Sequence, residues 1–256
     1  MKETSWERSA EWYDEHLKKD DTYQRKVILP QLLRAMDIKK GEMILDLACG
    51  SGFFSMEFMK AGAHLVGVDA SKTLIALAKK AVPQGQFYVG SSDKLSLIPN
   101  QSIDKVVVVL ALQNIENVAS TLKECARVLK PSGQTYIVLN HPAFRNPQES
   151  DWGWDESKKV QYRRIDRYLS ESKVKIQMHP GDAPSEYTIS FHRPLQFYFK
   201  ALRTSGFLTR SVEEWESHKK SQTGPRSMAE NRARKEIPVF LFLEAVKHPL
   251  SIYFLK

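Results

Sequence analysis

Short apolar runs alternate with helical stretches between Ile44 and Leu139, and this alternation constrains the fold more than any other feature of the sequence. Each run is rich in Val, Ile and Leu and is hydrophobic on both faces, which is typical of buried strands in a parallel sheet. The five predicted strands are Ile44–Leu47, Leu65–Val68, Phe87–Val89, Lys105–Leu110 and Thr135–Leu139. Because strands that alternate with helices form β-α-β units, we expect a doubly wound α/β fold.

Apolar residues spaced three and four positions apart predict the helices between these strands. One helix has Ser71 as its predicted N-cap and an apolar face made of Leu74, Ile75, Ala78 and Ala81. A second helix begins near Val118, and the turn residues Pro131-Ser132-Gly133 are predicted to end it.

The stretch Ile44-Leu45-Asp46-Leu47-Ala48-Cys49-Gly50-Ser51-Gly52 is the most informative motif. A buried strand leads into a glycine-containing loop that opens a helix, and such a loop lets a ligand approach the backbone closely. The next strand ends in Asp69, where a carboxylate can accept both hydroxyls of a ribose that lies across the strand ends. The sequence therefore predicts a nucleoside-type cofactor at this edge of the sheet.

These motifs resemble those of the Rossmann-like, class I S-adenosylmethionine-dependent methyltransferases, of the small-molecule type that includes the ubiquinone and menaquinone methyltransferases. The resemblance covers about residues 40 to 140 and implies S-adenosyl-L-methionine as cofactor. It implies that the methionine part lies against Asp46, Ala48, Gly50 and Gly52 and that Asp69 holds the ribose. Further cofactor positions matched in this way are Ala70, Ser92, Asp93, Leu110 and Gln113. We also expect Tyr13 to close over the sulfonium, because an aromatic face attracts a cation.

The resemblance implies a mostly parallel seven-stranded sheet with a final antiparallel strand. On this basis we expect residues 1–256 to form a single domain. Its predicted parts are an N-terminal helical cover (1–40), a cofactor-binding core (41–140), an inserted substrate lid (141–190) and a C-terminal helix with closing strands (191–256).

Aromatic side chains next to arginines mark the predicted lid. Such pairs can stack a flat acceptor while a guanidinium binds its acidic group, which makes Trp154, Tyr162, Arg163, Tyr168 and His192 candidate substrate residues. The alternative is a hairpin whose aromatic side chains fill its own small core.

The catalytic residues are unknown at this stage. His141, His192 and Arg193 are candidates for deprotonating an acceptor or binding its anion. The alternative for each histidine is a satisfied structural role.

Charge and composition limit the partners. The net charge is +8, but most of the basic excess follows residue 140 and is interrupted by acidic and apolar residues. It indicates a solvated surface or an electropositive substrate mouth, and we expect no nucleic-acid partner. The longest apolar run, Val106–Leu112, is too short to span a bilayer. The chain has only two cysteines, Cys49 and Cys125, and a polar N-terminus, so we expect a cytoplasmic protein. Because the sequence shows no cluster of carboxylates at the strand ends, we expect no metal.

The expected function is methyl transfer by in-line displacement to a small molecule that is aromatic or acidic. A nicotinamide dehydrogenase fits less well, since Ser55 replaces the third glycine of its G-x-G-x-x-G motif. An RNA methyltransferase and a non-catalytic cofactor-binding module remain alternatives, and the acceptor atom and the number of subunits stay open.

Overall fold

The computed structural model describes residues 4–178 and 187–248. Parts of the predicted cover, lid and C-terminal segment, namely residues 1–3, 179–186 and 249–256, lie outside the described residues.

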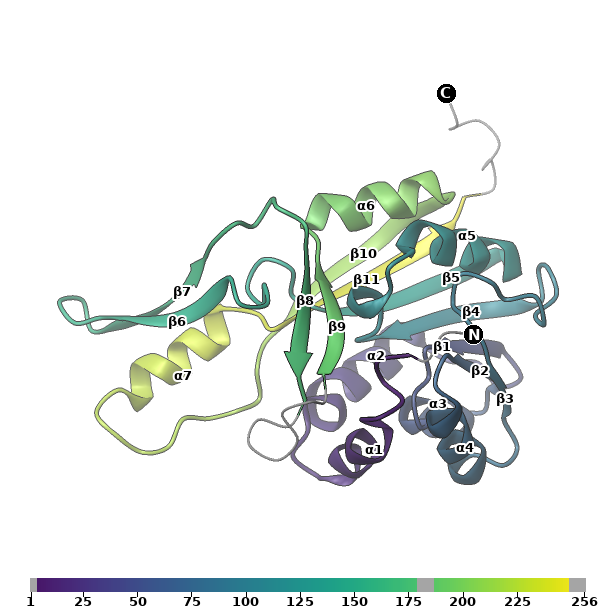
Figure 1. Ribbon diagram of the computed structural model, residues 1–256, viewed down its shortest axis with the longest axis horizontal. Coiled ribbons are helices and arrows are strands. Elements are labelled where there is room, and N and C mark those ends of the chain that lie inside the picture. The colour runs from purple at the N-terminus through teal and green to yellow at the C-terminus, as the bar shows by residue number, and fades with distance from the viewer. Residues whose placement is uncertain (1–3, 179–186, 249–256) are drawn as a thin grey trace.

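Seven strands form one sheet in the order β10-β11-β5-β4-β1-β2-β3 (Figure 1). They are β1 (Met43–Leu47), β2 (His64–Asp69), β3 (Gln86–Val89), β4 (Ile103–Val109), β5 (Leu129–Asn140), β10 (Phe207–Trp215) and β11 (Phe240–Lys247). The strands β1 to β5 pair in parallel, and β11 pairs antiparallel with both β5 and β10. The prediction of a mostly parallel seven-stranded sheet with a final antiparallel strand is confirmed.

Helices cover both faces of this sheet, as the doubly wound prediction requires. One face carries α2 (Leu29–Met36), α3 (Phe53–Lys60) and α4 (Lys72–Ala81), and the other carries α5 (Val118–Val128) and α6 (Leu195–Thr204). Adjacent residues of β1 separate into the two cores: Ile44 packs on the α3 side and Leu45 on the α5 side. An apolar layer on each side explains why the strand sequences are hydrophobic on both faces.

The end of α5 differs from its prediction. The helix stops at Val128, and Pro131-Ser132-Gly133 lie inside β5. The pairing of β4 with β5 shifts there, since Ile103 faces Leu129 whereas Lys105 faces Gln134. The turn residues therefore form an irregular start of the strand instead of ending the helix.

The N-terminal segment consists of α1 (Ala10–Lys18), a π-helical turn (Gln24–Ile28) and α2. Its contact with the core is apolar, since Leu17, Ile28 and Leu32 are buried in the α3-side core. Before α1, the Glu7 carboxylate accepts the backbone N–H of Lys72 and of Thr73 at the start of α4. This contact fixes the first residues of the described chain against the sheet's helical layer.

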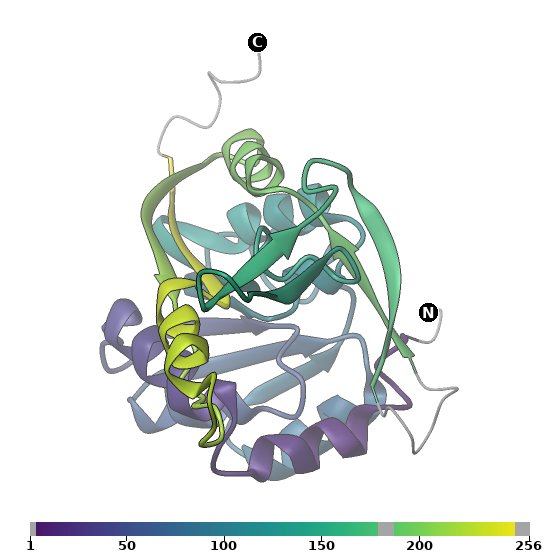
Figure 2. The same cartoon turned by 90° about the vertical axis from the view of Figure 1, so that its left-hand side faces the viewer.

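The segment that follows β5 forms two hairpins separate from the main sheet. They are β6 (Ser150–Asp155) with β7 (Val160–Ile165), and β8 (Ser172–Gln177) with β9 (Tyr187–His192). Hairpin β6–β7 and α7 (Ser227–Glu236) extend together to one side of the sheet (Figure 1). Hairpin β8–β9 instead reaches back towards the N-terminal segment (Figure 2).

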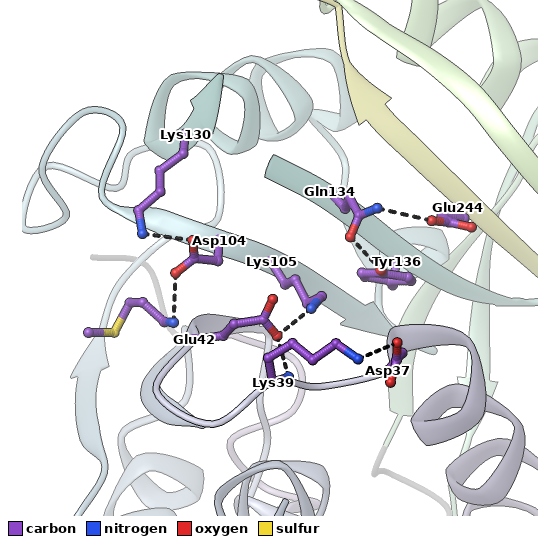
Figure 3. A network of polar contacts seen from close by, with 10 residues as sticks. Asp37, Lys39, Glu42, Asp104, Lys105, Lys130, Gln134, Tyr136 and Glu244 are labelled. Carbon is purple, nitrogen blue, oxygen red and sulfur yellow. Dashed lines mark hydrogen bonds and ion pairs between the residues drawn. The ribbon is translucent and has the colours of Figure 1, made fainter. Parts of the chain in front are cut away.

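A network of charged side chains occupies the amino-terminal ends of the central strands (Figure 3). The ammonium group of Lys105, which is 5% exposed, pairs with Glu42 just before β1. Asp104 accepts the N–H of Met43 at 2.9 Å and pairs with Lys130 at 2.7 Å. The network therefore ties β1, β4 and β5 together at one end of the sheet, which leaves the opposite end for a site.

Candidate functional site

A cavity of about 260 Å³ lies outside the carboxyl ends of the parallel strands. The order of the strands reverses between β1 and β4, and ligands of open α/β sheets bind in the crevice at such a point. Its lining comes from the N-terminal segment and from the loops after β1, β2, β3 and β4. The lining residues are Thr4, Trp6, Tyr13, Ala48, Gly50, Val68, Asp69, Ala70, Leu74, Gly90, Ser91, Ser92, Asp93, Val109, Leu110, Ala111, Asn114, Ile115, Glu116 and Asn117.

The loop after β1 has an unusual backbone where it borders the cavity. Ala48 and Gly50 have φ values of +59° and +56°, and Gly52 has +84°. Such left-handed conformations suit glycine and are strained for alanine. A Cβ on Gly50 would meet the Tyr13 ring at 3.8 Å, so the missing side chain leaves open space between the loop and that ring. Gly52 instead packs against α4, where its Cβ would meet Ala78 at 3.3 Å.

Asp69 faces the cavity from the end of β2. Its two carboxylate oxygens accept the N–H of Gly50 at 3.0 Å and the N–H of Ser71 at 2.9 Å. Burial raises the pKa of Asp69 above its ordinary value, while the N–H donors of Ser71 and Gly50 act in the opposite direction. Each oxygen keeps a second lone pair, so the carboxylate can accept a pair of hydroxyl groups from a ligand.

Asp46 lies beneath the loop and does not line the cavity. Its carboxyl group accepts the Ser55 hydroxyl at 2.6 Å. Burial and, to a smaller extent, the negative charge of Asp69 raise the pKa of Asp46 to about 7, although the hydrogen bond from Ser55 acts in the opposite direction. Burial raises the pKa of Tyr13 above its ordinary value, and the negative charges of Asp69 and Asp46 also raise it. The carboxylates therefore favour a positively charged ligand next to Tyr13.

The loop after β3 forms the next part of the wall. The Asp93 carboxylate accepts the Ser91 hydroxyl and the Asn117 amide, the latter at 3.1 Å. These two donors lower the pKa of Asp93, so the group is a carboxylate at neutral pH. Ser92 shares a hydrogen bond of 3.0 Å with Thr121 in α5. These contacts join the β3 loop to the start of α5.

The loop after β4 completes the wall. Leu110 has a φ of +51°, and its carbonyl oxygen accepts the side-chain amides of Gln113 at 2.8 Å and Asn114 at 3.3 Å. Asn114 lines the cavity of about 260 Å³, whereas Gln113 lines a separate, smaller cavity. The two amides thus brace one turn from its opposite sides.

The N-terminal segment roofs the cavity. The rings of Trp6 and Tyr13 meet edge to face, with centroids 5.3 Å apart. The hydroxyl of Ser5 accepts the N–H of Ile189 in β9 at 3.3 Å, so the segment also touches hairpin β8–β9. Figure 2 shows these two parts of the chain side by side. Residues far apart in sequence therefore close the cavity.

The structure brings most of the predicted cofactor residues together. Eight line the cavity: Tyr13, Ala48, Gly50, Asp69, Ala70, Ser92, Asp93 and Leu110. Of the others, Asp46 and Gly52 lie behind the glycine loop, and Gln113 faces the smaller cavity.

The candidate substrate residues of hairpin β6–β7 lie away from this cavity. The Trp154 indole donates to Glu156 and stacks under Arg226, and Tyr162 lies across from Gly153, half exposed. Arg163 donates to the carbonyl oxygen of Phe144 at 2.8 Å. These contacts support the hairpin itself.

The remaining candidates also have partners. The Tyr168 hydroxyl accepts the N–H of Leu195, and its carbonyl oxygen accepts Nε2–H of His192 at 2.7 Å. His141 is buried: its Nε2 lies 2.7 Å from Glu214, and its Nδ1 accepts two backbone N–H groups. Burial lowers the pKa of His141 although Glu214 opposes this. Arg193 and His192 border the smaller cavity.

Several lining residues had no counterpart in the sequence analysis. Asn114 and Asn117 follow β4 directly, and a search for amide side chains in that loop could have found them. Thr4 and Trp6 carry no such signal, because only tertiary contacts bring them to the cavity.

The described residues were examined for metal-binding clusters and for helices that could cross a membrane. Within residues 4–178 and 187–248, no group of three or more His, Cys, Asp or Glu side chains is placed to hold a metal ion. In the same ranges no helix combines the length and the apolar character that crossing a bilayer requires.

Proteins with a similar sequence or structure include several methyltransferases. Residues 45–137 match a family model described as a methyltransferase domain. The chain is 33% identical to a demethylmenaquinone methyltransferase of Chlorobaculum parvum over 46% of this chain and 49% of that protein. It is 31% identical to the enzyme of the same name from Streptomyces avermitilis, over 47% of this chain and 52% of that protein. The chain thus spans about half the length of the curated relatives it matches.

A solved structure extends the likeness over most of the chain. An S-adenosylmethionine-dependent methyltransferase from Mesorhizobium loti superimposes with a TM-score of 0.67 at 28% identity. The match covers 85% of this chain and 96% of that one. The likeness therefore includes the sheet that positions the cavity.

Proposed function

We propose that this chain, whose residues 45–137 match a methyltransferase domain, is a class I S-adenosylmethionine-dependent methyltransferase that transfers the methyl group of its cofactor to a small molecule. One observation carries the proposal: Asp69, Gly50 and Tyr13 surround a single cavity at the point where the order of the strands reverses. The menaquinone-type relatives support a small-molecule acceptor.

S-adenosyl-L-methionine is the cofactor of this domain. The residues fit it, because Asp69 offers free lone pairs for ribose hydroxyls and the side-chain-free face of Gly50 leaves room beside the loop. When bound, the cofactor supplies an electrophilic methyl group on a positively charged sulfur.

The residues of the chain then have to orient the cofactor, shield it from water and stabilise its positive charge. Asp69 and the β3 loop orient the nucleoside half, and Asp46 and Asp69 provide the negative potential that favours a sulfonium. Trp6 and Tyr13 exclude water from above. Positioning of this kind supplies roughly 7–11 kcal/mol of a barrier, so methyl transfer needs few reacting side chains.

We also propose that residues 1–40 act as a cover and 141–190 as a substrate lid within a single domain. The contact of Ser5 with Ile189 supports this, because it joins the two segments beside the cavity. We further propose that the methyl acceptor is a small molecule and that the protein is cytoplasmic. Cys49 and Cys125, which are both reduced and buried, are consistent with that location.

Replacing Asp69 tests the cofactor site. In isothermal titration, Asp69→Ala is expected to bind S-adenosylmethionine at least about tenfold more weakly, because charge-assisted hydrogen bonds contribute roughly 1.5–3 kcal/mol each. Asp151→Ala, at an exposed position of β6, is the matched control and should bind like the unmodified protein. Equal affinity of the Asp69→Ala variant would remove the proposed site.

Turnover separates the alternatives. Transfer of label from methyl-labelled S-adenosylmethionine to any small molecule excludes the non-catalytic module. An RNA methyltransferase would instead bind RNA with an affinity that falls steeply as salt increases.

A further inference from the structure

A groove of about 570 Å³ lies between hairpin β6–β7 and α7 and shares no lining residue with the cofactor cavity. Its volume is in the range of about 300–1,000 Å³ that is typical of ligand pockets. The apolar part of its lining consists of Val160, Met228, Ala229, Ala233 and Ile237. The polar part consists of Lys159, Gln161, Arg232 and Glu236. The groove is thus an apolar surface, with polar side chains beside it, that methyl transfer does not use.

Apolar side chains at this groove are open to water. Met228 is 87% exposed at the start of α7, and Val160 is 46% exposed at the start of β7. Tyr162 is 47% exposed and lies on the same face of β7 as Val160, because it is two residues further along the strand. Since apolar surface is more stable away from water, these side chains favour a partner that covers them.

The elements that form the groove contribute little to the core of the protein. Of the ten residues of α7, only Ala233 is buried, and a helix of this length is marginal without packing partners. Hairpin β6–β7 forms a sheet of its own. Figure 1 shows that both elements extend to one side of the main sheet. A projecting unit of this kind can reach a flat surface without interference from the rest of the molecule.

Basic side chains dominate the exposed charge of this unit. Among residues 155–160 and 226–236, the exposed acidic residues are Glu156 and Glu236. The exposed basic residues in the same ranges are Lys158, Lys159, Arg226, Arg232 and Lys235. The surface around the groove therefore has an excess of positive charge.

The acidic side chains of the hairpin tip are neutralised within the tip. Asp155 pairs with Lys158, and Glu156 pairs with Lys159. In contrast, Arg232 lines the groove and forms no ion pair with a carboxylate of residues 4–178 or 187–248. A cation beside exposed apolar side chains matches the two parts of an anionic lipid, the headgroup and the acyl chain.

The aromatic side chains of the hairpin argue against a nucleic acid as the occupant of this surface. Single-stranded nucleic acids bind by stacking their bases on aromatic rings. Here the guanidinium of Arg226 lies over the Trp154 ring, 4.6 Å from its centroid. The Tyr162 ring lies against Gly153, where an added Cβ would come within 2.3 Å of it. Each of these rings has a covered face, and the most exposed apolar side chain of the unit is the aliphatic Met228.

We propose that hairpin β6–β7 and α7 dock on the surface of a membrane that contains anionic lipids. Met228 and Val160 insert between the acyl chains, and Arg232 and Lys235 contact the headgroup phosphates. A neutral membrane offers only the apolar contacts, and a soluble polyanion offers only the charged ones. The inference goes beyond the proposed function and does not depend on it, since none of these residues lines the cofactor cavity.

Co-sedimentation of the full chain with lipid vesicles tests the docking. The probes are vesicles of phosphatidylcholine alone and vesicles in which one third of the lipid is phosphatidylglycerol. We expect the protein to bind the anionic vesicles at least tenfold more tightly than the neutral ones. Added salt should weaken this binding, because it screens the attraction between exposed charges.

A fluorescent label at residue 228 tests which part of the surface is inserted. Cys49 and Cys125 are buried, so a solvent-sensitive fluorophore will react with the new thiol of Met228→Cys. Its emission should shift to the blue when anionic vesicles are added. Leu97→Cys is the matched control, because Leu97 is 69% exposed in the loop after β3, and its label should not shift.

Two charge-changing variants separate the apolar contacts from the basic ones. Met228→Glu and Arg232→Gln should each weaken binding to anionic vesicles at least threefold. Leu97→Glu and Arg203→Gln are the matched controls, since both positions are exposed and lie outside the unit, and they should bind normally. All four positions are exposed, so the variants should keep the Tm of the unmodified protein.

The inference is overturned if neither kind of vesicle binds, if neutral vesicles bind as tightly as anionic ones, or if Met228→Glu binds normally. Tighter binding to an oligouridylate than to anionic vesicles would assign the basic surface to nucleic acid instead. A dimer in solution that Met228→Glu dissociates would assign the groove to a second copy of the chain. Either of these results also overturns the membrane proposal.

Discussion

Asp46 is a buried carboxyl group directly beneath the loop that borders the cofactor cavity. It is 2% exposed, and burial raises its pKa from an ordinary 3.8 to about 7. The folded chain therefore takes up a proton at this group between those two pH values. Because the folded state then binds more protons than the unfolded state, this group makes the protein less stable as pH rises through that window.

Asp46→Asn tests this pH dependence, since asparagine is neutral throughout and can still accept the Ser55 hydroxyl. We expect the variant to gain stability relative to the unmodified protein as pH rises from 5 to 8, by a few degrees in Tm. Thermal unfolding at several pH values without cofactor measures the difference. A difference in Tm between the two proteins that stays constant over this pH range would contradict the raised pKa of Asp46.

The residues of the glycine loop were predictable, because the loop's chemistry is contained in a few consecutive positions. Ala48, Gly50 and Asp69 line the cavity that the motif indicates. Trp6 was not predictable, since nothing near it in sequence marks it as part of a roof. Gln113 shows a third case: the loop was identified, but the side of the turn on which its amide points depends on packing.

At the scale of elements, one side chain of the N-terminal segment, Glu7, forms hydrogen bonds with the start of α4. Glu7 accepts the N–H groups of Lys72 and Thr73 and the hydroxyl of Thr73. Ser71 accepts the N–H of Leu74 in the same first turn. The two side chains together satisfy three of the backbone donors that a helix start leaves free.

Glu7→Gln should lower the free energy of unfolding by about 1 kcal/mol, the usual value of a helix cap, and weaken cofactor binding several-fold because Trp6 loses its anchor. Burial alone would raise the pKa of Glu7, but hydrogen bonds from Ser71 and Thr73 outweigh it and leave the pKa lowered. The stabilisation is thus present above an ordinary pKa of 4.5 and is lost as pH falls through the lowered value.

Chemical denaturation and calorimetric titration of this variant measure both effects. Glu11→Gln, in the exposed first turn of α1, is the matched control and should alter neither quantity. Equal stabilities of Glu7→Gln and the unmodified protein at pH 7 would show that the segment is held in another way.

Strand positions were predictable from apolar runs, whereas element ends and hairpins depended on context. The helix after Asn117 ends at Val128 because β5 begins at Leu129, two residues before the turn signal at Pro131, and pairs irregularly with β4. Trp154 and Tyr162 were ambiguous between a lid and a self-packed hairpin. Their contacts with Glu156 and Gly153 keep them within the hairpin.

At the scale of the whole molecule, the network of charged side chains and the ligand site lie at opposite ends of the sheet. Lys105 and Glu42 pair at the amino-terminal ends of the strands (Figure 3), and the cavity lies at the carboxyl ends. Lys105→Met should therefore lower stability by about 2 kcal/mol, since it leaves Glu42 unpaired, without changing the affinity for S-adenosylmethionine.

The double variant Lys105→Met/Glu42→Gln is the control for this prediction. It should recover at least half of the lost stability, because it removes the unpaired charge. Denaturant titration and calorimetry measure both quantities. A loss of cofactor affinity in the folded single variant would show that the two ends of the sheet are coupled.

The overall strand arrangement was predictable because periodicity and the resemblance both indicate it. The convergence of the first residues with hairpin β8–β9 was not, since a contact such as that of Ser5 with Ile189 leaves no local pattern in either segment.

That contact also has a consequence for synthesis on the ribosome. The floor of the cavity is complete once residue 140 has emerged, but its first-made residues, 4 to 13, must wait for a hairpin translated much later. A nascent chain stalled before residue 187 would thus hold its roof through the contact of Glu7 with α4 but without the contact of Ser5 with Ile189. We expect such a truncated chain to retain cofactor far less well than the released protein.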